Sequence, residues 1–142
     1  TASQAVRQLF TEAQRTVQCH QRCCDSLRRL LFKHEAAWVE YFTCVTRILV
    51  CGKRDAGVER LVLFVALVAA SSAGAPGAGQ DVLVRTVEFL LERSIAADKA
   101  VRFRCCQIVG AVWAEMRSEQ ERPMDLADRV VEVLLPRLRD KV

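Results

Sequence analysis

Residues 98–116 read Asp-Lys-Ala-Val-Arg-Phe-Arg-Cys-Cys-Gln-Ile-Val-Gly-Ala-Val-Trp-Ala-Glu-Met, and their pattern indicates the fold class. Its apolar residues recur every three or four positions, which predicts a helix that begins at the N-cap residue Asp98. The inward stripe of this helix comprises Val101, Cys105, Ile108, Val109, Val112 and Met116. The first four of these have counterparts 43 residues earlier, namely Val58, Val62, Val65 and Ala66. The chain therefore repeats a helical unit.

A second set of apolar residues repeats at nearly the same interval. Ile48-Leu49 lies 42 residues before Leu90-Leu91, which in turn lies 43 residues before Val133-Leu134. A two-helix unit of about 43 residues falls within the roughly 40–47 residues of HEAT and armadillo repeats. We therefore predict an all-α fold, a right-handed α-solenoid of HEAT repeats with about seven helices, in preference to a closed bundle.

Apolar periodicity predicts seven helices, at residues 3–15, 18–32, 35–51, 58–71, 81–94 and 98–116, and from residue 126 toward the end. The fourth is apolar nearly all round, so we expect it to lie between neighbouring helices. Asp81 is the predicted N-cap of the fifth helix. We expect Gly110 to allow a close helix approach and Pro136 to kink the last helix.

This pattern divides the chain into a capping helical pair (1–34), a repeat (35–71), a second repeat (81–117) and the first helix of a third (126–142). Residues 72–80 contain Ala-Gly-Ala-Pro-Gly-Ala-Gly and are predicted to form a flexible loop. A lone first helix leaves its apolar face uncovered, because each repeat buries its core against the next. We therefore expect the chain to be the N-terminal part of a longer solenoid.

Seven cysteines, an odd number, fall mostly within apolar helical patterns. This placement predicts reduced core thiols in a cytosolic or nuclear protein, because small secreted domains pair their cysteines between loops. Cys19 and Cys23 share a helix face, but a structural zinc site needs four ligands and no second Cys/His pair has ligand spacing. We therefore expect no metal. The most apolar run, Leu61 to Ala70, is too short to span a bilayer.

Catalytic motifs are missing from the sequence. It has two histidines, no Gly-rich phosphate loop, and no Ser/His/Asp or paired-carboxylate arrangement. We therefore expect a protein that is not an enzyme, needs no cofactor and takes no small-molecule substrate.

Three stretches resemble the N-terminal region of the CAP-G-type HEAT-repeat subunits of the condensin complex. They are residues 53–60 (Lys-Arg-Asp-Ala-Gly-Val-Glu-Arg), residues 89–105, in which Phe-Leu-Leu precedes Lys-Ala-Val-Arg-Phe-Arg-Cys, and residues 138–142 (Leu-Arg-Asp-Lys-Val). Residues 98–102 also resemble the Asp-x-x-Val-Arg entry to the second helix of a HEAT repeat. One departure is the uncharged segment 72–80, where animal members carry an acidic stretch.

The resemblance implies a non-catalytic condensin subunit that binds the kleisin subunit (CAP-H type). It also implies sequence-independent contact with double-stranded DNA during mitotic chromosome condensation, and a location in nucleus, cytoplasm and chromosome. No membrane partner is implied. The alternative class is a HEAT-repeat adaptor or transport scaffold, which would bind peptides and not DNA.

The net charge of +4 is concentrated in the first third of the chain, where residues 1–56 hold 9 Lys or Arg and 5 Asp or Glu. Phosphate contacts require only exposed, long cationic side chains. The candidate DNA-binding residues are Lys53, Arg54, Arg102, Arg104, Arg22, Arg29, Arg137 and Lys141. The competing interpretation is that these residues form solvated turns and faces, with Arg102 paired to Asp98. The resemblance favours DNA contact at Lys53 and Arg54.

Overall fold

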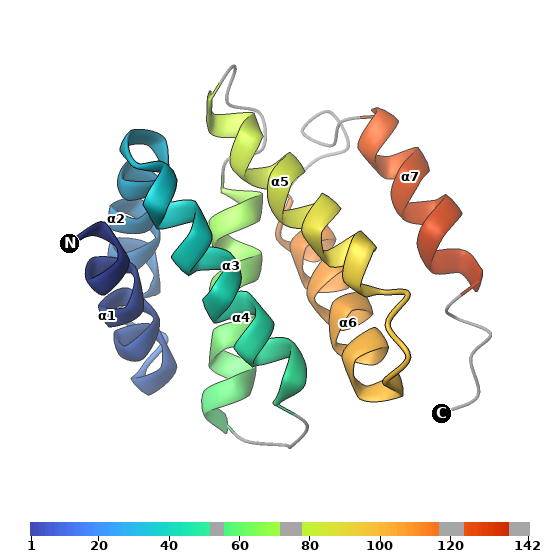
Figure 1. The fold of residues 1–142 in the computed structure, drawn as a ribbon, viewed down its shortest axis with the longest axis horizontal. Coiled ribbons are helices and arrows are strands. Elements are labelled where there is room, and N and C mark those ends of the chain that lie inside the picture. Colours follow the sequence, from blue (N-terminus) through green and yellow to red (C-terminus); the bar gives the residue numbers. More distant parts are fainter. Residues whose placement is uncertain (52–55, 72–77, 117–123, 137–142) are drawn as a thin grey trace.

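The computed structural model describes residues 1–51, 56–71, 78–116 and 124–136. In these residues the chain forms seven helices and no strand, as Figure 1 shows. The helices are α1 (Ala2–Arg15), α2 (His20–Lys33), α3 (Glu35–Val50), α4 (Ala56–Ala70), α5 (Ala78–Arg93), α6 (Lys99–Glu115) and α7 (Met124–Leu134). The predicted all-α fold class is confirmed.

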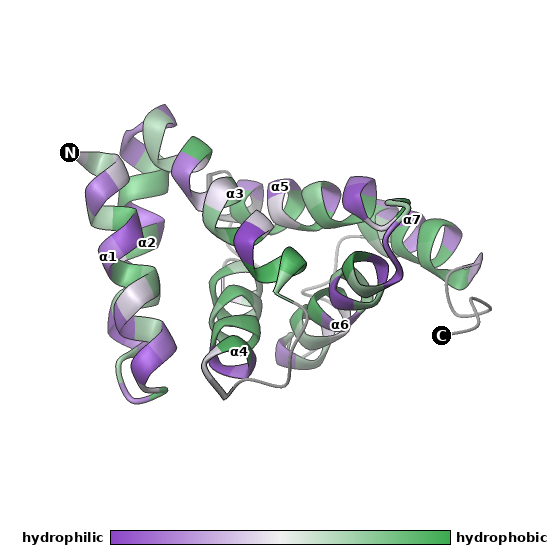
Figure 2. Cartoon of the chain, turned by 60° about the horizontal axis from the view of Figure 1, so that its bottom comes forward, coloured by the Kyte–Doolittle hydropathy of each residue, from purple (hydrophilic) through white to green (hydrophobic). Residues whose placement is uncertain are grey.

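The helices are arranged in pairs that stack side by side. In Figure 2, α3, α5 and α7 lie in one layer and α4 and α6 lie in a second layer beneath it, while α1 and α2 stand at one end. The helix pairs α3–α4 and α5–α6 therefore form a HEAT-like arrangement. The most extensive helix–helix contact joins α4 to α6 within the second layer.

Helix α4 is the centre of the core. It contacts α1, α2, α3, α5 and α6, and the side chains of Phe64, Val65, Ala66 and Val68 are completely buried. A helix that is apolar on all sides is stable only where neighbours cover each side. The prediction that this helix lies between its neighbours is confirmed.

Two buried polar contacts join elements within this core. The hydroxyls of Tyr41 in α3 and Thr86 in α5 lie 2.9 Å apart and are fully buried, so they link two helices of the same layer. His20 at the start of α2 is 2.9 Å through Nε2 from the carbonyl oxygen of Ala13 in α1. Such pairs remove the cost of burying an unpartnered polar group.

The helix starts differ in how well the sequence predicts them. Asp98 is the N-cap of α6, as predicted, and its Oδ1 accepts a hydrogen bond of 2.8 Å from the backbone N–H of Ala100. Asp81 is not an N-cap, because α5 begins at Ala78 and Asp81 lies in its first turn. A carboxylate is favourable in a first turn as well as at a cap, so residue type alone does not separate the two positions. Residues 78–80 consequently belong to α5 and not to the predicted loop, of which residues 72–77 lie outside the described residues.

Two further expectations about single residues were wrong. Pro136 does not kink α7, because that helix ends at Leu134 and Pro136 follows it in a short 3₁₀ turn. The ring of proline clashes with the carbonyl four residues before it, which opposes a continuing helix. Gly110 is exposed, and a methyl group added there would meet no atom of another described element within 4 Å, so no other described helix approaches it closely.

Candidate nucleic-acid interface

Three helices begin along one edge of the molecule. The N-terminal ends of α2, α4 and α6 all lie at the lower edge in Figure 1. We call this the turn edge and define it by residues 15–22, 47–51, 56–60 and 96–104. Backbone N–H groups at a helix start carry partial positive charge, so an edge that collects three helix starts favours negatively charged ligands.

Exposed cationic side chains add to this positive charge. Arg15, in the last turn of α1, and Lys99, at the start of α6, are exposed and form no ion pair within the described part of the chain. Arg60 near the start of α4 donates from Nε to the carbonyl oxygen of Gln14 over 2.6 Å, which fixes it beside the end of α1. None of these three residues is among the DNA contacts predicted from the sequence. Their positions near predicted helix ends could have suggested them as candidates, but only the pairing of the helices brings those ends together.

The acidic side chains of the turn edge are engaged within the chain. Glu59 lies 3.7 Å from Arg104 and accepts a hydrogen bond of 3.4 Å from Gln107. Asp98 caps α6. The uncompensated charge that the described part of this edge presents to solvent is therefore positive.

Arg102 and Arg104 were both predicted to contact phosphates, and the structure places them differently. Arg102 is half-buried and donates from Nη1 to the carbonyl oxygens of Ala96 and Ala97, over 2.9 and 2.7 Å. It therefore holds the connection between α5 and α6.

Arg104 lies in the interior, with 7% of its surface exposed. It donates to the carbonyl oxygen of Cys51 over 3.0 Å and to Oε1 of Gln107 over 2.8 Å. Together with its ion pair to Glu59, these contacts join α6 to the end of α3 and the start of α4. A buried guanidinium is stable only when it is paired in this way, so these donors are already occupied by the fold.

Arg22 and Arg29 lie two turns apart on α2, and both side chains are exposed. Arg22 pairs with Glu12 of α1 over 3.2 Å, and Arg29 donates to the hydroxyl of Ser26 over 3.2 Å. Hydrogen bonds from Cys23 and then from Arg22 lower the pKa of Glu12, so this carboxyl stays ionised and partly neutralises Arg22. Arg22 belongs to the turn edge, whereas Arg29 lies further along α2.

The remaining predicted contacts, Lys53, Arg54, Arg137 and Lys141, lie outside the described residues. In the sequence, Lys53 and Arg54 fall between the end of α3 and the start of α4, and both of these helix ends belong to the turn edge.

All seven cysteines are free thiols, and Cys23, Cys24, Cys44 and Cys105 are buried. Burial is the main cause that raises the pKa of Cys44 to about 11 and the pKa of Cys105 to about 12. Cys51, the last residue of the helix predicted over 35–51, is exposed because α3 ends at Val50. Among the described residues, no three His, Cys, Asp or Glu side chains gather as metal ligands would. Nor does any helix in this part of the chain have the length and apolarity that crossing a membrane requires.

Comparison with known proteins shows a similarity to a condensin subunit. The chain is 27% identical over 147 residues to condensin complex subunit 3 of Xenopus laevis, and the alignment covers 96% of this chain. It covers 14% of the relative, so the chain spans about one seventh of that protein's length. No protein-family model matches the chain. The chain is thus similar to a condensin subunit along nearly all of its own length.

Proposed function

We propose that this chain is a HEAT-repeat segment of a condensin-type subunit that contacts the DNA backbone without reading its sequence and performs no catalysis. The all-α stack of helix pairs and the similarity to condensin complex subunit 3 support the condensin relation. Within the complex we propose the kleisin subunit as protein partner. Nucleus, cytoplasm and chromosome are the corresponding locations.

The observation that carries the DNA contact is the positive turn edge. Three helix starts, the exposed cations Arg15 and Lys99, and the proposed contacts Arg22 and Arg102 all belong to this edge. Phosphates are bound by long cationic side chains and by helix N-termini, and such contacts carry no base information. We therefore propose weak sequence preference and strong salt dependence.

Two proposed contacts, Lys53 and Arg54, lie between α3 and α4 in sequence, and we propose Arg29 of α2 as a further contact. Arg137 and Lys141 are proposed for the connection that follows α7. We propose that Arg104 acts indirectly, since its contacts to Cys51 and Glu59 hold the helix ends from which the other cations project. A kleisin segment closing over the bound duplex would convert electrostatic capture into enclosure.

The proposal is tested by measuring the affinity of the chain for a fluorescein-labelled duplex of arbitrary sequence across a series of salt concentrations. Fluorescence anisotropy gives the slope of log K against log salt. Each phosphate contact contributes about −0.9 to that slope, so the double variant Lys53→Ala/Arg54→Ala is expected to make it shallower by roughly 1.8.

The control is Lys33→Ala, which removes an exposed cation at the opposite end of α2 and is expected to leave the slope unchanged. If the chain fails to bind the duplex at low salt, the DNA-contact proposal is wrong. In that case a HEAT-repeat adaptor that binds peptides is the better description.

A further inference from the structure

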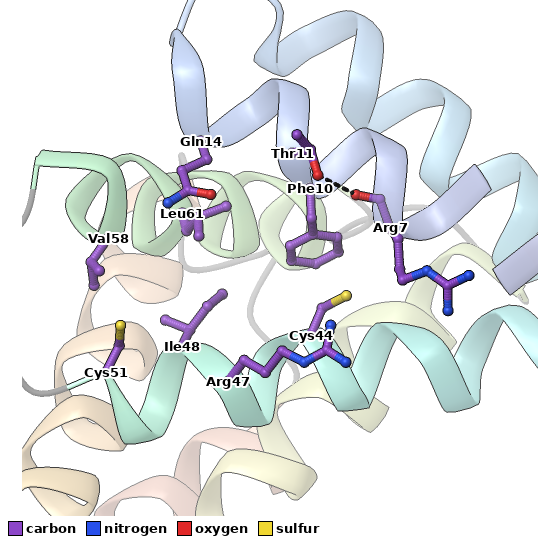
Figure 3. A pocket seen from close by; sticks show the side chains of 10 residues that line it. All are labelled: Arg7, Phe10, Thr11, Gln14, Cys44, Arg47, Ile48, Cys51, Val58 and Leu61. Carbon is purple, nitrogen blue, oxygen red and sulfur yellow. Dashed lines mark hydrogen bonds between the residues drawn. The ribbon is translucent and has the colours of Figure 1, made fainter. Parts of the chain in front are cut away.

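A pocket of about 280 Å³ lies between α1, α3 and α4. Figure 3 shows the apolar side chains of Phe10, Ile48 and Leu61 directed into it from these three helices. Its mouth is polar and is lined by Arg7, Gln14 and Arg47. The pocket therefore combines an apolar floor with a cationic mouth.

The two arginines at the mouth differ in how their charge is balanced. Arg7 donates from Nη1 to Oε1 of Glu40 over 2.9 Å, and Glu40 is nearly buried, so this charge is compensated inside the chain. Arg47 is exposed and forms no ion pair with any residue in the described ranges. The thiol of Cys44, which lies between the two arginines in Figure 3, has a pKa raised to about 11 by burial and stays neutral. The mouth consequently presents one uncompensated positive charge.

The size of the pocket restricts its occupant. Sites for cofactors and drug-sized ligands are usually about 300–1,000 Å³, so a pocket of about 280 Å³ is comparable only to the smallest of them. A pocket of this size can take one large apolar side chain. DNA presents no such group along its phosphate backbone, so the apolar floor favours a protein ligand. Peptide-binding grooves commonly combine an apolar pocket for one anchor residue with a charged contact beside it.

We propose that this pocket docks a peptide segment of a partner protein, which inserts one bulky apolar side chain against Phe10, Ile48 and Leu61 and places an adjacent Asp or Glu on Arg47. Charge complementarity at Arg47 selects acidic over basic peptides. Arg47 lies on the turn edge but is not one of the cations assigned to the duplex, so its variant is measured with both peptide and duplex to separate the two proposals.

The test begins with a random-peptide display library selected on the full chain. We expect the selected peptides to share a bulky apolar residue next to Asp or Glu. A fluorescein-labelled synthetic peptide with that consensus is then titrated with the chain and two variants. Thr11→Trp blocks the mouth from an exposed position of α1, and Arg47→Glu reverses the charge. Each is expected to weaken binding by about tenfold or more.

The matched control is Lys33→Glu, a charge reversal on an exposed residue of α2 that is assigned to neither ligand, and it is expected to leave peptide affinity unchanged. A second measurement uses Cys51, an exposed thiol that lines the pocket. Bound peptide is expected to slow its alkylation by N-ethylmaleimide. This readout does not depend on any variant folding correctly.

Selection of peptides without the apolar–acidic pair, or binding that Thr11→Trp leaves intact, would overturn the inference. The inference would also be overturned if the library yielded no peptide and Arg47→Glu lost duplex binding. Those results would assign the mouth of the pocket to DNA. Failure of the DNA proposal has a different signature, because the chain would then bind the peptide and not the duplex.

Discussion

The guanidinium of Arg104 in α6 donates a hydrogen bond of 3.0 Å to the carbonyl oxygen of Cys51, which follows α3. This contact crosses from one helix pair to the next, over 53 positions in sequence. The last carbonyls of a helix have no partner within that helix, so a buried donor from a neighbouring repeat satisfies one of them. Arg104 thereby fixes how two helix pairs stack.

Replacing this arginine is expected to destabilise the fold. In Arg104→Ala, the hydrogen bond to the Cys51 carbonyl and the ion pair to Glu59 are lost, and hydrogen bonds to charged groups contribute about 1.5–3 kcal/mol. We expect the free energy of unfolding, measured by urea denaturation, to fall by that amount. The exposed control Arg15→Ala is expected to change it by less than about 0.5 kcal/mol. A variant as stable as the parent chain would contradict the structural role of Arg104.

The buried pair Tyr41–Thr86 predicts a measurable coupling between α3 and α5. Tyr41→Phe leaves the hydroxyl of Thr86 buried without this partner, and a lost buried partner costs about 1–3 kcal/mol. The double variant Tyr41→Phe/Thr86→Val removes both polar groups and is expected to be more stable than the single variant. Thermal unfolding of all four proteins gives the coupling energy. Strictly additive effects would show that the hydroxyls do not interact.

Helix α6 contains a position where stability can be gained. Because a methyl group at Gly110 would meet no neighbour and glycine costs helix interiors about 0.5–1 kcal/mol relative to alanine, Gly110→Ala is expected to stabilise the chain by that amount. The reverse change at the exposed Ala114 of the same helix, Ala114→Gly, is expected to destabilise it. Equilibrium urea unfolding measures both. A destabilised Gly110→Ala would show that a close helix approach exists there after all.

Buried thiols make stability depend on alkaline pH. The pKa of Cys105 rises from an ordinary 9.0 to about 12 in the folded chain, with burial as the largest cause. Between these values the unfolded chain loses this proton and the folded chain keeps it. The stabilising contribution is therefore complete below pH 9 and is lost as the pH rises toward 12, by roughly 1.4 kcal/mol per pH unit for one thiol.

Urea unfolding at a series of pH values from neutral to alkaline checks this prediction. Cys105→Ala is expected to be less stable at neutral pH but to lose stability less steeply as the pH rises. Cys51→Ala, which removes an exposed thiol, is the control and should keep the parent slope. Equal slopes for all three proteins would contradict the prediction.

The ion pair between Arg22 and Glu12 allows the turn edge to be tested with a variant that is expected to bind the duplex more tightly. Glu12→Gln removes the negative charge 3.2 Å from Arg22 and leaves the guanidinium free to contact a phosphate. Surface pairs contribute up to about 1 kcal/mol, so duplex affinity at low salt is expected to rise by up to about fivefold. Glu132→Gln, the same change on an exposed residue of α7, is the control. Equal affinities for both variants would place Arg22 outside the DNA contact.

Much of the local structure was predictable because it depends on neighbours in sequence. The stripe of α6, from Cys105 to Val112, is buried as its spacing predicts, and Asp98 caps that helix. The candidate site was less predictable. Spacing places Arg102 and Arg104 on different faces of one helix but does not say which face meets α3 and α4. Arg15 and Lys99 were missed for the same reason, since they lie 84 positions apart in sequence.

Helix periodicity and capping are local properties of the backbone, so the paired helices and the basic first third follow from the order of the residues alone. Which cations face solvent depends on how the helices pack together. The carbonyl of Cys51 and the carboxylate of Glu59 draw Arg104 into the interior, whereas Arg15 and Arg47 have no acidic partner in the described part of the chain. That distinction depends on packing between residues far apart in sequence, and no local pattern encodes it.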